Sequence, residues 1–70
     1  MIKYYRIKNK YTQEELARIL NITLRHYQNI ESYKSIPNVL TAIKLSKLLN
    51  ANIEDIFNEK YYKSLISKQS

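Results

Sequence analysis

The sequence predicts an all-α domain, compact and built from four to five short helices. Residues suited to helix N-caps precede several apolar segments, at Thr12, Thr23, Asn38 and Asn52. Within these segments the apolar residues follow helical spacing, and β-branched residues nowhere alternate with polar ones over a useful length. The connections are only a few residues long, without repeats or low-complexity stretches, so one small domain is expected.

The first clearly marked helix is expected from Gln13 to Leu20. Thr12 and Glu15 have the spacing of a capping box, in which each side chain accepts a hydrogen bond from the backbone N–H of the other. Asn21 follows, and asparagine tolerates the left-handed conformation that ends many helices. Upstream, apolar residues indicate an opening helix over residues 1–9.

The next helix must turn sharply against this one, because only Asn21 and Ile22 separate Leu20 from the N-cap candidate Thr23. A further helix is predicted over Val39–Leu49, followed by a short one over Ile53–Phe57. Beyond them, residues 58–70 form an extension whose apolar residues also have helical spacing, namely Tyr61, Tyr62, Leu65 and Ile66.

Length and charge limit the possible functions. Seventy residues support only a marginal core, and domains of this size often need disulfides, a metal or a partner subunit. The chain has no cysteine and one histidine, so oligomerisation is the support that remains. Twelve Lys and Arg against six Asp and Glu give a net charge of +6. This excess favours nucleic acid as a partner, then an acidic membrane surface, with solubility alone as the alternative.

No apolar run approaches the roughly 20 residues of a membrane span, and the N-terminal residues lack the apolar block of a signal peptide. We therefore expect a soluble, cytoplasmic protein without membrane association. Catalysis is not expected, because the acidic pairs Glu14/Glu15 and Glu54/Asp55 lie in first helical turns and His26 has no nearby carboxylate in sequence. Without glycine there is no phosphate-binding loop, and we expect no cofactor and no small-molecule ligand.

The helix that follows Thr23 carries the most informative pattern. At about 100° per residue, Tyr27 and Ile30 fall on one face, which must be the core face. The opposite face carries Arg25, Gln28 and Asn29, with Leu24 and His26 at its margins. Arginine matches the two acceptors of guanine in the major groove, and asparagine or glutamine matches adenine. Any exposed helix face can be polar, so this face alone is weak evidence for DNA binding. The stronger evidence is its position after a capped helix and a sharp turn.

At this point the chain resembles the Cro/CI-type (Xre-like) helix-turn-helix family of bacterial and phage regulators. The resemblance covers residues 2–57. The motifs that carry it are Thr12-Gln13-Glu14-Glu15-Leu16-Ala17, Ile22-Thr23, Ile30-Glu31, Pro37-Asn38-Val39, Ala42-Ile43-Lys44-Leu45-Ser46-Lys47-Leu48-Leu49 and Asn52-Ile53-Glu54-Asp55-Ile56-Phe57. The resemblance implies a five-helix, lambda-repressor-like DNA-binding domain over residues 1–57, with the helix at 23–32 entering the major groove.

The resemblance also implies roles for individual residues. The residues matching base-reading positions are Leu24, Arg25, His26 and Asn29, and the helix face adds Gln28. The residues matching backbone-contacting positions are Gln13, Thr23, Lys34 and Asn38, although a solvated loop lysine is a nearly equal interpretation of Lys34.

The chain departs from the family at three places where glycine is usual, which hold Lys10, Asn21 and Tyr33. Asn21 suits a positive φ, whereas at Lys10 and Tyr33 we expect a different backbone or strain, or a recognition helix that runs one residue longer. Tyr27 replaces a smaller aliphatic residue, so its ring should be buried with the hydroxyl reaching a partner or the surface.

These observations predict a sequence-specific regulator of transcription, a repressor that binds a palindromic operator in double-stranded DNA as a homodimer. The residues expected at the dimer interface are Ile53, Ile56, Phe57, Tyr61 and Leu65. The alternative is an antitoxin-like or other protein-interaction module with the same fold. A basic protein of the membrane surface is a third interpretation, at which residues 58–68 only hint.

Overall fold

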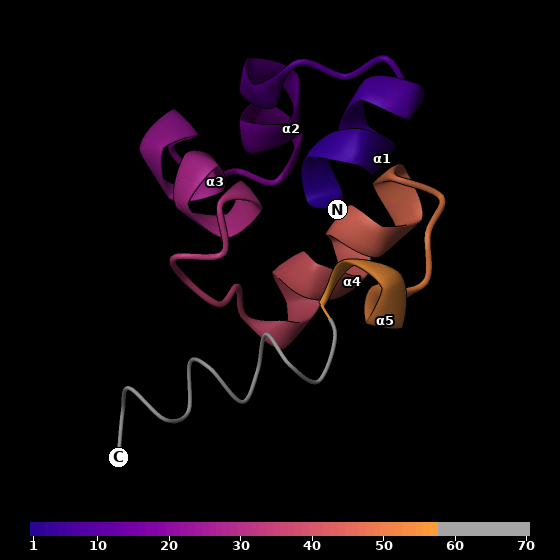
Figure 1. Ribbon diagram of the computed structural model, residues 1–70. Helices are drawn as coiled ribbons and strands as arrows, with labels where there is room; N and C mark the ends of the chain where they lie inside the picture. Colours follow the sequence, from indigo (N-terminus) through magenta and orange to yellow (C-terminus); the bar gives the residue numbers. More distant parts are fainter. Residues whose placement is uncertain (58–70) are drawn as a thin grey trace.

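The computed structural model describes residues 1–57, which form five α-helices and no strand (Figure 1). The helices are α1 (Ile2–Lys8), α2 (Gln13–Ile19), α3 (Leu24–Glu31), α4 (Val39–Leu48) and α5 (Ile53–Ile56). The all-α class and the five-helix order predicted from the sequence are confirmed. Each helix ends one residue before the predicted end, because the last predicted residue is the C-cap.

Side-chain caps begin three of the helices as predicted. At α2 the Thr12 hydroxyl accepts from the Glu15 N–H at 3.0 Å, while the Glu15 carboxylate accepts from the Thr12 N–H at 2.9 Å. Thr23 caps α3 by accepting from the N–H of His26 at 3.0 Å. Asn38 caps α4, and Asn52 precedes α5 without a side-chain cap hydrogen bond.

Four helices end in the same left-handed turn, although the chain contains no glycine. The residues with positive φ are Lys10, Asn21, Tyr33 and Asn50, at 62°, 58°, 62° and 51°. Each turn has two hydrogen bonds running back into the helix, as in Tyr33 N–H to Ile30 and Lys34 N–H to Asn29 after α3. The backbone at positions 10 and 33 is therefore the one that glycine would adopt, and α3 does not run on past Ser32.

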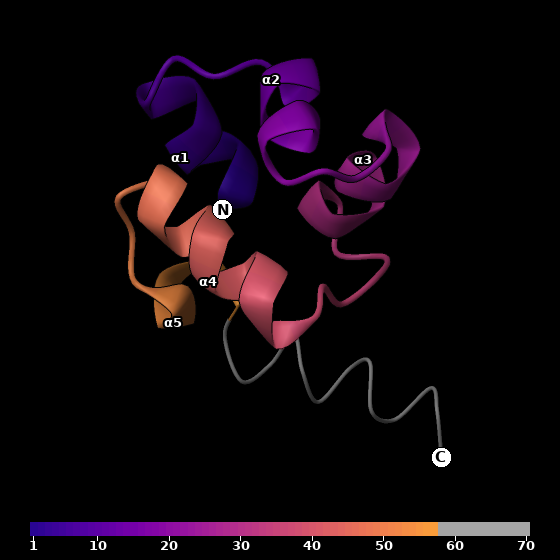
Figure 2. The same ribbon diagram turned by 180° about the vertical axis from the view of Figure 1, so that it is seen from behind.

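The core takes residues from all five helices. Leu16, Tyr27, Ile30 and Leu45 have no exposed surface, and Ile2 of α1 is equally buried. In both views α2 and α3 lie together on one side of the molecule, and α4 with α5 on the other (Figures 1 and 2). Within residues 1–57, no helix combines the length and the apolar character needed to cross a bilayer.

The side chain of Tyr33 connects the two halves of the domain. Its hydroxyl accepts from the backbone N–H of Ile2 at 3.3 Å and donates to the carbonyl oxygen of Ile56 at 3.0 Å. The N–H of Ile2 is one of the α1 groups that have no partner within the helix. The loop after α3 is thereby fixed to the start of α1 and the end of α5.

Candidate nucleic-acid interface

A sharp turn places α3 across α2. Leu20 ends α2 with its side chain buried in the core, and Asn21 reverses the chain with its positive φ. The N–H of Ile22 bonds back to Ala17 at 2.9 Å, and Thr23 starts α3 directly afterwards. The turn is therefore determined at both ends, and α3 is presented at a fixed angle to α2.

The two faces of α3 are separated as the helical spacing predicted. Tyr27 and Ile30 are fully buried, whereas Arg25 and Gln28 are exposed and Asn29 is half-buried. The margins of the polar face, Leu24 and His26, are exposed as well. The outward face thus carries side chains that can donate and accept hydrogen bonds, on a helix whose other face is anchored in the core.

An open hollow lies beside this face, between α1, α2 and α3. The residues that line it are Lys3, Gln13, Arg25, Gln28, Asn29, Glu31, Ser32 and Lys34. The structure therefore brings together five of the predicted DNA-contacting residues, those at positions 13, 25, 28, 29 and 34. The other four are not among the residues lining the hollow: Leu24 and His26 are exposed on α3, and Thr23 and Asn38 are helix caps.

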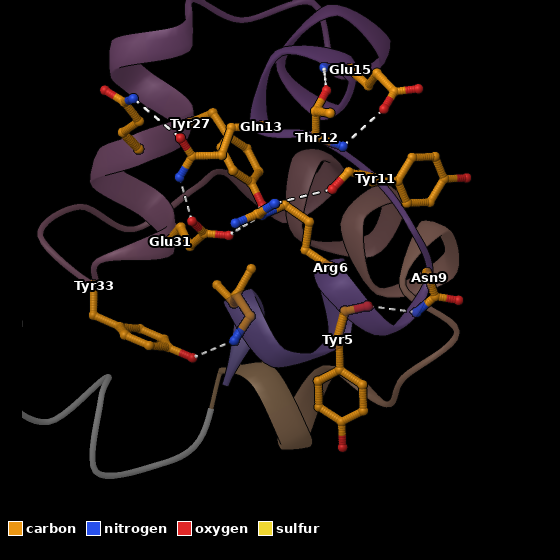
Figure 3. Close-up of polar contacts among 12 residues, drawn as sticks. Tyr5, Arg6, Asn9, Tyr11, Thr12, Gln13, Glu15, Tyr27, Glu31 and Tyr33 are labelled. Carbon is orange, nitrogen blue, oxygen red and sulfur yellow. Dashed lines mark hydrogen bonds and ion pairs between the residues drawn. The ribbon is translucent and has the colours of Figure 1, made fainter.

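Three helices meet at the Glu31 carboxylate. Arg6 Nε of α1 donates to Oε1 at 2.7 Å, and the Tyr27 hydroxyl donates to the same oxygen at 3.1 Å. Gln13 Nε2 of α2 donates to Oε2, and Gln13 Oε1 in turn accepts from Gln28 Nε2 at 3.2 Å (Figure 3). The Arg6 and Glu31 side chains are only 12% and 8% exposed, so solvent screens this ion pair weakly.

These contacts change the titration of both acidic groups. Burial alone raises the pKa of Glu31, but the hydrogen bonds from Arg6, Gln13 and Tyr27 and the Arg6 charge outweigh burial, and the pKa is lowered. The pKa of Tyr27 is raised, first by burial and then by the Glu31 charge. Glu31 is therefore ionised and Tyr27 is protonated at neutral pH. As expected from the sequence, the Tyr27 ring is buried and its hydroxyl reaches a partner, the Glu31 carboxylate.

Sequence reasoning did not select Lys3 or Ser32, nor the part that Glu31 plays in the hollow. Lys3 lies on a helix for which the sequence offered no contact motif, and it joins the hollow only because α1 packs beside α3. Glu31 was recognised as part of a family motif, yet the motif does not reveal that its carboxylate bonds to Gln13. The only signal in the sequence for this role of Glu31 was its place as a polar residue beside the buried face of α3.

The residues expected at a dimer interface differ in their exposure. Ile53 is exposed, but Ile56 and Phe57 are 1% and 2% exposed and belong to the core of the same chain. They complete the packing of α5 on the domain, so their side chains are not available to a second subunit in this conformation. Tyr61 and Leu65 lie outside the described residues.

The domain has a capped helix, a sharp turn and a second helix whose outward face carries Arg, Gln and Asn beside two lysines. This arrangement defines a helix-turn-helix DNA-binding domain. The family model described as helix-turn-helix matches residues 2–56, and the chain belongs to this family, of the Cro/CI (Xre-like) type. The resemblance predicted from the motifs is confirmed. The family is one of DNA-binding regulatory domains and is not typically enzymatic. Comparisons with curated proteins and with solved structures found no match.

Proposed function

We propose that this protein is a sequence-specific regulator of transcription, a repressor that binds a palindromic operator in double-stranded DNA as a homodimer in the cytoplasm. The outward face of α3 enters the major groove. Arg25, Asn29 and Gln28 read base edges, and Leu24 and His26 reach bases from the margins of the same face. Gln13, Thr23, Lys34 and Asn38 contact the phosphate backbone.

One observation carries this proposal: the hollow gathers hydrogen-bonding side chains from α3 and cations from two other segments. Lys3 and Lys34 come from α1 and the loop after α3, and Arg25 from α3 itself. The acidic residue in the hollow, Glu31, is paired with Arg6. Cations beside a groove-sized helix supply affinity for phosphates, and the amide side chains supply specificity.

The homodimer is supported by apolar surface that the domain leaves exposed. On α4, Val39, Leu40 and Ile43 are 75%, 62% and 39% exposed, and they fall within about 100° of one helix face. Ile53 of α5 is exposed as well. A small domain with a marginal core is stabilised when such surface is covered by a second copy.

The test is selection of bound duplexes from a random-sequence pool, with the stoichiometry of the complex measured by sedimentation. We expect a palindromic site with half-sites roughly 34 Å apart, one turn of B-DNA, and two chains per duplex. Affinity for the selected duplex should exceed that for random duplex by about 1,000-fold or more. A protein that selects no duplex, yet captures a defined protein partner, would instead act as an interaction module.

A further inference from the structure

A chain of hydrogen bonds leads from the Glu31 carboxylate to a residue on the exposed face of α3. Glu31 Oε2 accepts from Gln13 Nε2, and Gln13 Oε1 accepts from Gln28 Nε2 at 3.2 Å (Figure 3). Glu31 and Gln28 both belong to α3, and Gln13 is the first residue of α2. These two hydrogen bonds therefore link two residues of α3 through one residue of α2.

The chemistry of the groups fixes the direction of every bond. An ionised carboxylate can only accept, so Gln13 must turn its Nε2 toward Glu31. Its Oε1 then lies on the opposite side of the amide and can only accept from Gln28. Gln28 must consequently direct Nε2 toward α2, which leaves its Oε1 facing away from α2.

Glu31 is well suited to impose this direction. Arg6 and Tyr27 both donate to its Oε1, at 2.7 and 3.1 Å, and keep the carboxylate ionised and immobile. Its side chain is 8% exposed, so water does not compete strongly for Oε2. Gln28, by contrast, is exposed and would rotate its amide freely without the bond to Gln13.

We propose that Glu31 is a positioning residue for base recognition: through Gln13 it fixes the amide of Gln28, so that this side chain presents an acceptor to the major groove. This inference rests on the proposed function. The partner that fits is a base with an exocyclic amino group, adenine or cytosine, because both donate from that position. Guanine and thymine present a carbonyl oxygen there, which faces the Gln28 oxygen unfavourably.

The decisive variant is Glu31→Gln, which keeps the size of the side chain and removes the fixed polarity. An amide at position 31 can donate or accept, so the amides of Gln13 and Gln28 are free to reverse. Gln13→Met breaks the same chain at a partly exposed position, in case Glu31→Gln unfolds the domain. Tyr27→Phe is the matched control, because it removes one bond to Glu31 and leaves the carboxylate and its charge in place.

The binding affinity of each variant is measured for the duplex that the wild type selects and for versions of it in which every base is substituted in turn. We expect one position per half-site where the wild type prefers adenine or cytosine about tenfold over guanine and thymine. Glu31→Gln and Gln13→Met should reduce this preference to within about twofold, while Tyr27→Phe retains it. A preference unchanged in both chain-breaking variants, or none in the wild type, would overturn the inference.

A second measurement needs no DNA. ¹⁵N relaxation of side-chain amides should show Gln13 and Gln28 Nε2 as ordered as the backbone in the wild type and in Tyr27→Phe, and mobile in Glu31→Gln. Mobile amides in the wild type would overturn the hydrogen-bond chain itself. Failure of the wild type to select any duplex, with ordered amides, would instead overturn the proposed function.

Discussion

The left-handed residues at the helix ends show how single side chains compensate for the absence of glycine. A positive φ costs most residues about 1–2 kcal/mol, and asparagine adopts it more readily. Asn21 and Asn50 use this tolerance. Tyr33 makes two hydrogen bonds through its hydroxyl and packs against the core, whereas Lys10 is exposed. The same backbone conformation is therefore stabilised in different ways at different ends.

This difference predicts opposite outcomes for two glycine substitutions. Lys10→Gly should raise the free energy of unfolding by about 1 kcal/mol, because it relieves the backbone and removes an exposed side chain. Tyr33→Gly should lower it by about 3 kcal/mol, since lost packing and hydrogen bonds outweigh the same relief. Urea denaturation followed by circular dichroism measures both. Stabilisation by both substitutions would show that the Tyr33 contacts contribute little.

Two cationic residues of the hollow are expected to act differently on DNA. Arg25→Ala should cost about 1–3 kcal/mol on the selected duplex and relax discrimination at one base position, because its guanidinium matches guanine. Lys34→Ala should weaken binding to all sequences alike and lower the salt dependence by about one ion. Asn29→Ala should resemble Arg25→Ala.

The measurement is binding of each variant to the selected and to random duplexes across a salt series. Ile7→Ala, at an exposed position of α1 that does not line the hollow, is the control and should bind as the wild type does. Equal loss on both duplexes for Arg25→Ala would make Arg25 a phosphate contact and would mean that α3 is rotated about its axis in the groove.

At the scale of elements, what the sequence predicted well was local. Caps such as Thr12 and Thr23 bond to N–H groups three residues away, so their pattern is readable without the fold. The hollow was not predictable as a whole, because Lys3 joins Lys34 only through the packing of α1. Ile56 and Phe57 are predicted at a dimer interface but are buried within the domain, because the buried side of a four-residue helix and its C-cap cannot be identified from so few apolar residues.

Glu31 makes the contact among α1, α2 and α3 dependent on pH. Its pKa in the folded protein lies below the ordinary value of 4.5, where burial opposes the change and the bonds from Arg6, Gln13 and Tyr27 prevail. A depressed pKa contributes stability that is present above the unfolded pKa and is lost as pH falls through the folded one. The three helices should therefore lose mutual support in acid.

We accordingly expect the urea midpoint of the wild type to fall as pH decreases below about 4.5. Glu31→Gln should be less stable at neutral pH by about 2 kcal/mol and should show a weaker fall in acid. Glu14→Gln, which removes an exposed carboxylate from the first turn of α2, is the matched control and should keep the wild-type profile. An unchanged acid profile in Glu31→Gln would place the titrating group elsewhere.

At the scale of the whole molecule, the polar and apolar surfaces occupy different places. The hollow lies between α1, α2 and α3, while the exposed aliphatic residues Val39, Leu40 and Ile43 lie on α4. In the proposed homodimer, a second copy that covers the α4 residues would therefore leave the residues lining each hollow uncovered. Ile53 on α5 offers a second apolar position, while Ile56 and Phe57 beside it are used internally.

This arrangement predicts which substitutions separate the subunits. Leu40→Glu should weaken self-association by at least about tenfold, because it places a charge on the exposed apolar face of α4. Ile53→Glu tests the α5 position in the same way, and Ile7→Glu makes an equal charge change on α1, where residue 7 is 57% exposed. Sedimentation equilibrium gives the association constant of each variant, and the fold is checked by circular dichroism. If Ile7→Glu alone dissociated the dimer, the interface would lie on α1. The two α3 helices would then be spaced differently, and the selected half-sites would depart from one turn of DNA.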